Sequence, residues 1–447
     1  MKRNISLITA ISIVVTNMIG IGILTTPGVI SSYLTSAGQV ILVWILGGLI
    51  AFLGAVVYGQ MGSIMPHSGG EFHYLSRIYH PILGQMAGWV SVVAGFAGPI
   101  ALSSLAFAKY SLNIILVNQF FSDSISVLFR EKMIALLLIF SVSLFHILRK
   151  RSALNFQLII TGLLITFLLL VSYLGLNYEG STVTERISSF SGHKLNFGMA
   201  LLLSVYSYTG WNASCYFAGH IHNPKRNLPL SLLLGVFIVI ILYLAVNYGL
   251  MQVLGEQQLS GQVDFLSDLG TKISGNLGNQ LISATVLVIL LASISSMVFT
   301  GSRIPLLKKN HAKTRHLELG RTGIAKMHVL QIGIAALLIV ITGFQELLLI
   351  LTIVLTFFTI LTAFGIFLLP WKRLAVSKSQ EIGVKLSAAA LLLVLIWLII
   401  NSFTQFERTN FGLIILAISI GIGLVSLLIF RKYYRKTSKQ TLQVNSI

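Results

Sequence analysis

The chain has 447 residues, of which 55% are hydrophobic and only 10% are charged. A soluble domain carries about 25% charged residues, so a mean hydropathy of +0.88 over this length excludes an ordinary soluble protein. The formal net charge of +19 would suit nucleic-acid binding in a soluble protein. Here the basic residues lie mainly between the apolar segments, on one side of the predicted membrane, and we expect no nucleic-acid partner.

Long apolar segments recur along the whole chain, and about 20 such residues are enough to cross a bilayer as a helix. We expect twelve spans, near residues 7–32, 39–65, 83–108, 133–148, 153–176, 197–220, 229–254, 279–302, 328–343, 346–369, 386–403 and 410–430. The sequence therefore predicts an all-α polytopic membrane protein, with residues 1–447 forming a single transmembrane domain in a lipid bilayer.

The distribution of basic residues predicts the orientation of these spans. With the N-terminus in the cytosol, the inner segments carry 24 of the 31 Lys and Arg residues. Cytoplasmic loops of membrane proteins carry this excess. We therefore expect a protein of the plasma membrane whose two termini are both cytosolic, with a basic cytosolic tail at 431–447.

The sequence offers no visible machinery for covalent chemistry. The twelve acidic residues all fall in loops or at the ends of predicted helices, which weakens any model of a carboxylate proton path through the membrane. The single cysteine, Cys215, excludes Cys-based zinc and iron–sulfur sites. We expect a protein that moves a solute and is not an enzyme, with no metal ion and no cofactor.

Two predicted spans contain glycines within polar segments at mid-depth. The first span carries Gly20 and Gly22 followed by Pro27, and the sixth carries Gly210 within residues 206–212. Such glycines often let helices pack closely, and this interpretation stays open. Breaks in two oppositely directed helices, five spans apart, are also typical of an inverted repeat that holds a charged solute on half-helix ends and freed carbonyls.

Several motifs resemble those of the amino acid–polyamine–organocation (APC) permeases. Residues 20–24 (Gly-Ile-Gly-Ile-Leu), followed by Pro27, are similar to the Gly-Ser-Gly-Ile-Phe signature of the first helix. Residues 66–72 (Pro-His-Ser-Gly-Gly-Glu-Phe) resemble the first cytosolic loop. Residues 208–212 (Tyr-Thr-Gly-Trp-Asn) and 223–229 (Asn-Pro-Lys-Arg-Asn-Leu-Pro) resemble the sixth helix and following loop of the L-type amino acid transporter branch.

The resemblance implies a LeuT-type fold that carries an L-amino acid, or a close relative, by alternating access. The first five-helix repeat would be residues 7–176 and the second, inverted repeat 197–369, with helices 1 and 6 discontinuous. Two further helices, 11 and 12, would lie within 386–430.

Family roles, carried over to matching positions, imply a pocket built mainly from backbone groups. The substrate carboxylate would meet N–H groups of residues 21–23, and the ammonium group would meet carbonyls near Met18, Ile19, Tyr206 and Ser207. Tyr206 would also be an aromatic gate, although packing between helices is the alternative for this side chain. The implied substrate-binding set is Asn17, Met18, Ile19, Gly20, Ile21, Gly22, Ile23, Tyr206, Ser207, Thr209, Gly210, Asn212 and Ser295, with Tyr206 and His220 as gating residues.

The chain departs from the family pattern at three of these positions. Ile21 replaces a small hydroxyl residue and Thr209 stands where the L-type branch often has glycine, so the pocket should favour small or medium neutral substrates. His220 replaces a common glutamate, and with His222 it could form a pH-sensitive inner gate or a simple interfacial histidine pair.

The coupling of transport stays open at this stage. Span 153–176 contains no Lys or Arg that could replace a sodium ion. Exchange is therefore the mechanism that needs the fewest groups not identified in the sequence. An exporter or a sodium- or proton-coupled symporter of the same fold, a non-transporting sensor or partner subunit, and a channel are the alternatives. No extracellular cysteine is available, so we expect no disulfide-linked accessory subunit.

Overall fold

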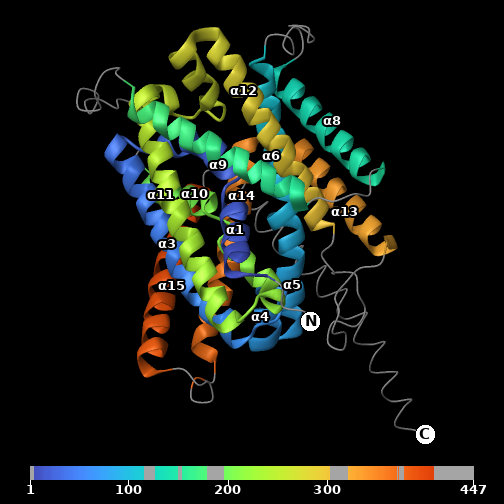
Figure 1. The fold of residues 1–447 in the computed structure, drawn as a ribbon, viewed down its shortest axis with the longest axis vertical. Helices are drawn as coiled ribbons and strands as arrows, with labels where there is room; N and C mark the ends of the chain where they lie inside the picture. Colours follow the sequence, from blue (N-terminus) through green and yellow to red (C-terminus); the bar gives the residue numbers. More distant parts are fainter. Residues whose placement is uncertain are drawn as a thin grey trace.

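The computed structural model describes residues 5–114, 126–148, 154–178, 196–302, 321–369, 371 and 377–406. In these ranges the chain is helical apart from its turns and one isolated bridge between Ile5 and Ile221. Figure 1 shows the helices packed side by side in one bundle. The predicted twelfth span at 410–430, the tail at 431–447 and residues 303–320 lie outside the described residues.

The helices fall where the apolar segments predict them. The first six spans correspond to α1 (Leu7–Met18) with α2 (Ile21–Ser31), α3 (Ala37–Ile64), α5 (Pro81–Val92) with the π-helix η1 (Val93–Ala97) and α6 (Gly98–Leu112), α8 (Val127–Leu148), α9 (Leu154–Leu176), and α10 (Phe197–Ser207) with the 3-10 helix η3 (Ala213–His220). The next five correspond to α11 (Pro224–Leu259), α12 (Phe265–Gly301), α13 (Arg321–Ile341), α14 (Phe344–Phe364) with η4 (Gly365–Leu368), and α15 (Lys378–Phe406). The short α4 (Glu71–Ile78) lies between the second and third spans.

Seven helices within the described ranges are long and apolar enough to cross a membrane, or eight if the bent pair α1 and α2 counts as one span. Large apolar side chains such as Leu137, Phe140 and Leu144 on α8 are more than half exposed. An exposed apolar row of this kind is stable where the surrounding solvent is lipid. The protein is therefore an all-helical polytopic membrane protein.

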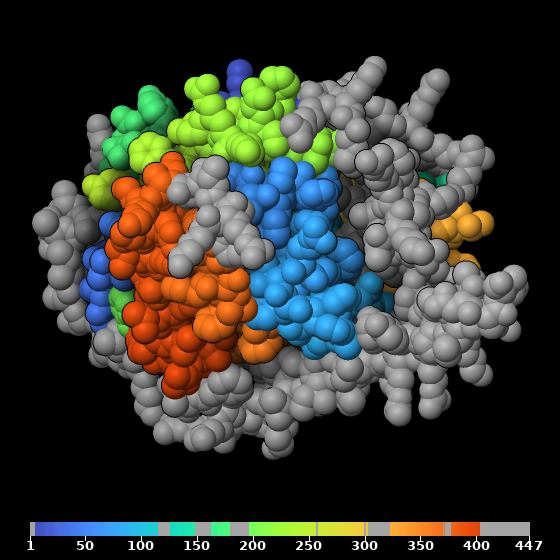
Figure 2. Space-filling model, turned by 90° about the horizontal axis from the view of Figure 1, so that it is seen from below, coloured from blue at the N-terminus to red at the C-terminus, as the bar shows by residue number. Residues whose placement is uncertain are grey.

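One side of the bundle is formed by α11, which packs along α3, α1 and α9. On another side, α15 packs against α3 and α14. Figure 2 looks at the lower end of the bundle in Figure 1 and shows α15, in orange-red, beside the blue segments that include α3 and α4. Elements from both ends of the sequence thus enclose the same interior.

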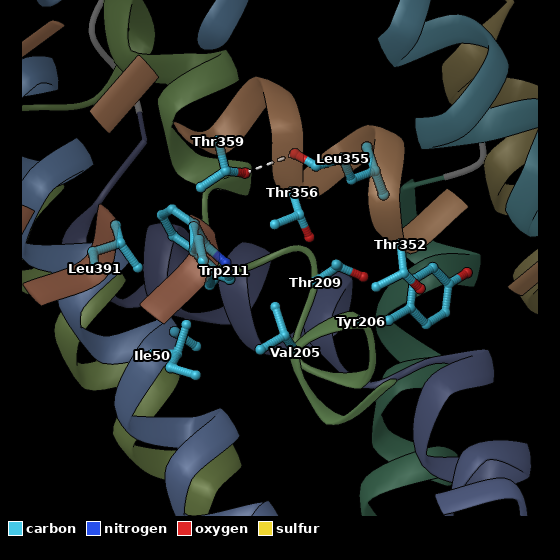
Figure 3. A pocket seen from close by; sticks show the side chains of 12 residues that line it. Ile50, Val205, Tyr206, Thr209, Trp211, Thr352, Leu355, Thr356, Thr359 and Leu391 are labelled. Carbon is cyan, nitrogen blue, oxygen red and sulfur yellow. Dashed lines mark hydrogen bonds between the residues drawn. The ribbon is translucent and has the colours of Figure 1, made fainter. Parts of the chain in front are cut away.

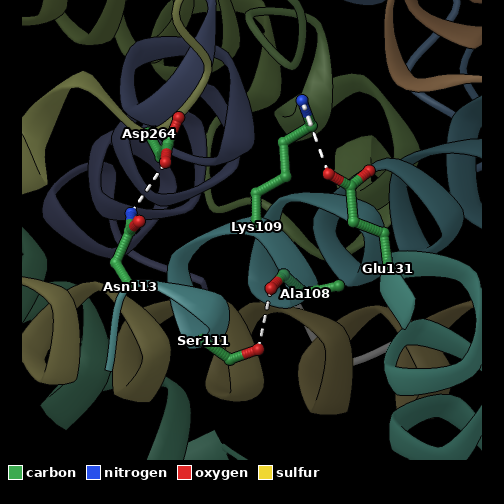
Figure 4. Close-up of polar contacts among 6 residues, drawn as sticks. All are labelled: Ala108, Lys109, Ser111, Asn113, Glu131 and Asp264. Atoms are coloured by element: carbon green, nitrogen blue, oxygen red, sulfur yellow. Dashed lines mark hydrogen bonds and ion pairs between the residues drawn. The ribbon is translucent and has the colours of Figure 1, made fainter. Parts of the chain in front are cut away.

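A polar cluster connects three elements where α6 ends (Figure 4). Lys109 forms an ion pair with Glu131 of α8 at 3.8 Å. The Asn113 side chain donates hydrogen bonds to Asp264 at 2.7 Å and to Ser267 at 3.0 Å, and these two acceptors lie at the start of α12. Residues of the predicted outer side therefore tie α6, α8 and α12 together.

Candidate functional site

The first membrane helix is broken, as the glycines predict. α1 ends at Met18, α2 begins at Ile21, and the two are bent by 42°. Gly20 is the N-cap of α2 and provides no side-chain hydrogen bond to it. The first N–H groups of a helix have no partners within the helix and carry partial positive charge. The break therefore leaves an uncapped, electropositive helix end inside the protein.

The sixth span is broken in the same way. α10 ends at Ser207, and the chain continues through a non-helical segment into η3, which begins at Ala213. Gly210 lies in that segment with φ +99, a conformation that side-chain-bearing residues rarely adopt. The segments predicted as the first and sixth spans are therefore both interrupted.

The two breaks touch each other through their glycines. A Cβ atom on Gly22 would lie 2.8 Å from the Cα of Ser207, and one on Gly210 would lie 2.4 Å from the carbonyl oxygen of Asn17. Neither contact leaves room for a side chain. A Cβ on Gly20 would meet nothing within 4 Å. Close packing and helix breaking, considered as alternatives from the sequence, occur here together.

One hydroxyl group connects both breaks. Tyr243 of α11 donates to the carbonyl oxygen of Met18 at 2.7 Å and also reaches that of Ser207 at 3.3 Å. Its ring packs edge-on against Trp44, at 5.6 Å between centroids. Carbonyls freed by a break need a hydrogen-bond donor when they are buried, and this tyrosine supplies one uncharged O–H, mainly to Met18.

Hydroxyl groups also join α2 to α10. Thr26 and Ser207 lie 2.5 Å apart through their side-chain oxygens. Each hydroxyl also lies within hydrogen-bonding distance of a carbonyl in its own helix, Gly22 for Thr26 and Leu203 for Ser207. Because each hydroxyl carries a single proton, the one that donates across the contact gives up the carbonyl of its own helix. The contact between the broken helices is therefore hydrogen-bonded as well as tightly packed.

A small pocket, open to its surroundings, lies beside the second break. Tyr206, Thr209 and Trp211 form one wall, and Figure 3 shows threonine side chains of α14 facing the same space. The remaining lining comes from Val205 of α10 and from α3, α14 and α15. The full set is Ile50, Ala51, Val205, Tyr206, Thr209, Trp211, Thr352, Leu355, Thr356, Thr359, Leu391 and Leu395.

The polar part of this pocket consists of hydroxyls without charge. Thr352 and Thr359 donate their hydroxyl protons to the carbonyls of Leu348 and Leu355, at 2.6 and 3.0 Å. Their oxygen lone pairs remain as acceptors. No charged side chain occurs among the lining residues. The pocket can accommodate an apolar or hydroxyl-bearing group and would disfavour a charged one.

The structure brings the predicted residues together only in part. Tyr206 and Thr209 line the pocket, whereas no residue of α1 or α2 does. Ile21, Gly22 and Ile23 are buried at the start of α2. The N–H groups predicted to hold a carboxylate are thus not part of the pocket lining.

The remaining predicted residues have other partners. Asn17 donates to Ile13 of its own helix at 2.8 Å, and Asn212 lies 3.5 Å from the carboxylate of Glu71. Ser295 pairs with His146 of α8 at 2.8 Å and is not among the residues that line the pocket.

His220 belongs to a clamp at the end of η3. Its ring lies 3.3 Å from the Ser68 hydroxyl, which also accepts the N–H of Gly219. Its carbonyl accepts the N–H of Ile5 at 3.0 Å, and the Ile5 carbonyl accepts the N–H of His222 at 2.9 Å. We call Ile5, Ser68 and η3 together the η3 clamp. It holds the chain entering α1 against the chain leaving η3.

The sequence did not single out three features of this region. Thr352, Thr356 and Thr359 recur at helical spacing within an apolar helix, a pattern that could have indicated a hydroxyl stripe. Tyr243 carries no such signal, and Glu71 was noted only as part of the motif at residues 66–72, without a role. Nothing in the sequence distinguishes a tyrosine that packs from one whose hydroxyl reaches two carbonyls.

Comparison with known proteins identifies the family of the chain. Residues 5–433 match a family model described as amino acid permease. The chain belongs to the amino acid permease family. The resemblance to the APC permeases is thereby confirmed, and the family and its relatives are transporters rather than enzymes.

Three relatives illustrate the range of similarity. The serine/threonine exchanger SteT of Bacillus subtilis is 25% identical over 311 residues, which are 68% of this permease and 67% of SteT. The human b(0,+)-type amino acid transporter 1 is 29% identical over 264 residues, 58% of this chain and 53% of that one. The mouse Asc-type amino acid transporter 1 is 23% identical over 311 residues, 68% and 58% of the two chains. The matched region thus spans little more than half the length of the two mammalian relatives.

Proposed function

We propose that this permease exchanges small or medium neutral L-amino acids across the plasma membrane by alternating access, on a twelve-helix LeuT-type fold with two inverted repeats. Support for transport comes from the family and its relatives, which are named as transporters and exchangers. Support for the repeats comes from breaks in the first and sixth spans, at Gly20 and Gly210.

The mutual contact of the two breaks is the observation that carries the proposal. An amino acid zwitterion needs a partial positive charge for its carboxylate and acceptors for its ammonium group. The uncapped start of α2 offers the former, and carbonyls near Met18 and Ser207 offer the latter. A movement that separates Gly22 from Ser207 would admit the substrate to these groups.

The neighbouring pocket supports a limited substrate size. Thr209 and Tyr206 narrow the pocket, and the threonines of α14 provide hydroxyl oxygens as acceptors. The substrate side chain would enter this space, which suits a short aliphatic or hydroxyl-bearing group. SteT is named as a serine/threonine exchanger, and serine, threonine and alanine are the first substrates to test here.

The proposal is tested by counterflow into proteoliposomes that contain the full chain. We expect labelled serine, threonine or alanine to enter only when the vesicles are preloaded with a neutral amino acid, with or without sodium. Tryptophan should compete weakly. Equal uptake into empty vesicles, a strict sodium requirement, or a preference for tryptophan would each contradict the exchange or size proposal.

A further inference from the structure

A buried carboxylate lies next to the second break, outside the groups used so far. Glu71 is the first residue of α4 and is only 6% exposed. Its Oε1 atom accepts the Tyr58 hydroxyl at 2.7 Å and lies 3.5 Å from the amide nitrogen of Asn212. A charged group in this position has lost most of its water and has one short hydrogen bond in return.

The carboxylate also has no cationic partner in the described part of the chain. No Lys, Arg or His forms an ion pair with Glu71 there. On its own helix, burial lowers the pKa of His73 to about 4, with His67 and Arg77 adding to the effect, so the imidazole is neutral near pH 7. Arg77 lies in the last turn of α4.

Within the described ranges, the other titratable groups around Glu71 are uncharged near pH 7. Tyr58 of α3 and Tyr74 of α4 lie near it, as do Cys215 and Tyr216 of η3. All four side chains are phenols or thiols, so none can neutralise a carboxylate.

The helices packed on α4 bring no compensating charge. α5 and η4 contain no ionisable side chain, and α14 brings Thr359 and Thr362 towards Tyr58. Glu346, the one charged residue of α14, caps the start of that helix through the N–H of Gly343. Burial therefore dominates and raises the pKa of Glu71 from 4.5 to about 7, while the Tyr58 hydrogen bond opposes the rise.

The surroundings of Glu71 connect η3 to the pocket wall. Tyr58 packs edge-on against Trp211 at 4.6 Å, and Trp211 and Thr359 line the pocket. Asn212 lies in the segment that leads into η3. Separation of η3 from α4 would take Asn212 away from Glu71 and admit water to the carboxylate.

We propose that Glu71 is a proton-binding site of the η3 clamp, in which the protonated carboxyl group stabilises the closed clamp and loss of the proton favours its opening. In the closed clamp the group is neutral and needs no counter-ion. In the open clamp it is hydrated and ionised. The consequence for transport rests on the proposed function, whereas the effect on the clamp does not.

The sign of the pH dependence follows from the two pKa values. The closed clamp binds the proton more tightly than the open clamp. The stabilisation of the closed clamp by this proton is therefore complete below about pH 4.5 and is lost as the pH rises to about 7. Within that window the ratio of closed to open clamp should fall by up to about tenfold per pH unit.

Cys215 provides a reporter that does not depend on any substrate. It is the single cysteine of the chain, lies in η3 and is fully buried. Maleimide should label it only when the clamp opens. The labelling rate of the full-length protein in proteoliposomes is measured as a function of pH. It is divided at each pH by the rate of a Glu71→Gln variant, and this ratio cancels the intrinsic pH dependence of the thiol.

We expect this ratio to rise at least about tenfold from about pH 5 to about pH 8, because only the unsubstituted chain loses the proton. Glu381→Gln is the matched control, since Glu381 is a partly exposed carboxylate paired with Lys385 on α15. The control should leave the labelling profile unchanged. A flat ratio, or the same change in the control, would overturn the proposal.

A second variant keeps the carboxylate and moves its titration. Tyr58→Phe keeps the ring that packs on Trp211 but removes the hydrogen bond that lowers the pKa of Glu71. The midpoint of the labelling profile should shift to higher pH, an effect that loss of packing alone would not produce. An unshifted midpoint would refute the assignment even if Glu71→Gln failed to fold. Absence of counterflow with an intact labelling profile would instead refute the proposed function.

Discussion

Gly22 and Gly210 decide whether the two broken helices can meet. At each position the backbone of the other break occupies the space of a side chain. Gly210 has the additional constraint of φ +99, which costs a non-glycine residue about 1–3 kcal/mol. Neither constraint applies to Gly20, where the sequence alone suggested equal importance.

Gly210→Ala should therefore lower the counterflow rate at least about tenfold, because the methyl group displaces the Asn17 carbonyl and strains the break. Gly333→Ala is the matched control, since a Cβ there would meet nothing within 4 Å, and it should retain normal flux. Thermal unfolding of both purified variants checks that they are folded. Normal flux in folded Gly210→Ala protein would contradict a role for the contact.

At the scale of elements, α1 and η3 are connected through a short pairing of backbone groups. Ile5 pairs in parallel with Ile221 and exchanges hydrogen bonds with His220 and His222. The same η3 is held by Ser68 from the loop before α4. A rocking motion of α1 against η3 would have to break this pairing, because it joins the chain entering α1 to the chain leaving η3.

A cross-link between residues 5 and 221 should lock the clamp. Paired strands lie about 4.8 Å apart, within the range of about 4.4–6.8 Å between Cα atoms that a disulfide spans. The variant carries Ile5→Cys and Ile221→Cys with Cys215→Ala. Oxidation should abolish counterflow and a reductant should restore it. Each single-cysteine variant serves as a control, and full activity of the oxidised double variant would show that the clamp does not open during transport.

For the whole molecule, the orientation in the membrane stays a prediction from charge. The basic residues assigned to the inner side outnumber those of the outer side by 24 to 7. Lys272 on α12 is assigned to the outer side and Lys378 on α15 to the inner side, and both residues are exposed.

In a Cys215→Ala background, a cysteine at 272 should therefore react with a membrane-impermeant maleimide in intact cells. A cysteine at 378 should react only after the membrane is permeabilised. Labelling is read on gels after purification, with the cysteine-free chain as the blank. The opposite pattern would invert the topology, and labelling of both sites in intact cells would contradict the odd number of crossings expected between them.

Much of the fold follows from the sequence by itself. The first eleven predicted spans coincide with described helices, because hydrocarbon thickness and backbone hydrogen bonding leave a membrane segment few options. Glycine and polar residues at mid-span were sufficient to predict both helix breaks. Sequence motifs were also sufficient to identify the family.

Tertiary structure alone decided which groups face each other. Glu71 lies at a helix end, where hydropathy predicts contact with water, yet the packing of α3, α4 and η3 buries it. Tyr243 sits in an apolar helix, and only the crossing of the breaks places two free carbonyls beside its hydroxyl. Ser295 follows the predicted helix but pairs with α8 instead of the pocket. The physical reason is common to all three: hydropathy and periodicity are local along the chain, whereas burial and hydrogen bonding depend on segments that are distant in sequence.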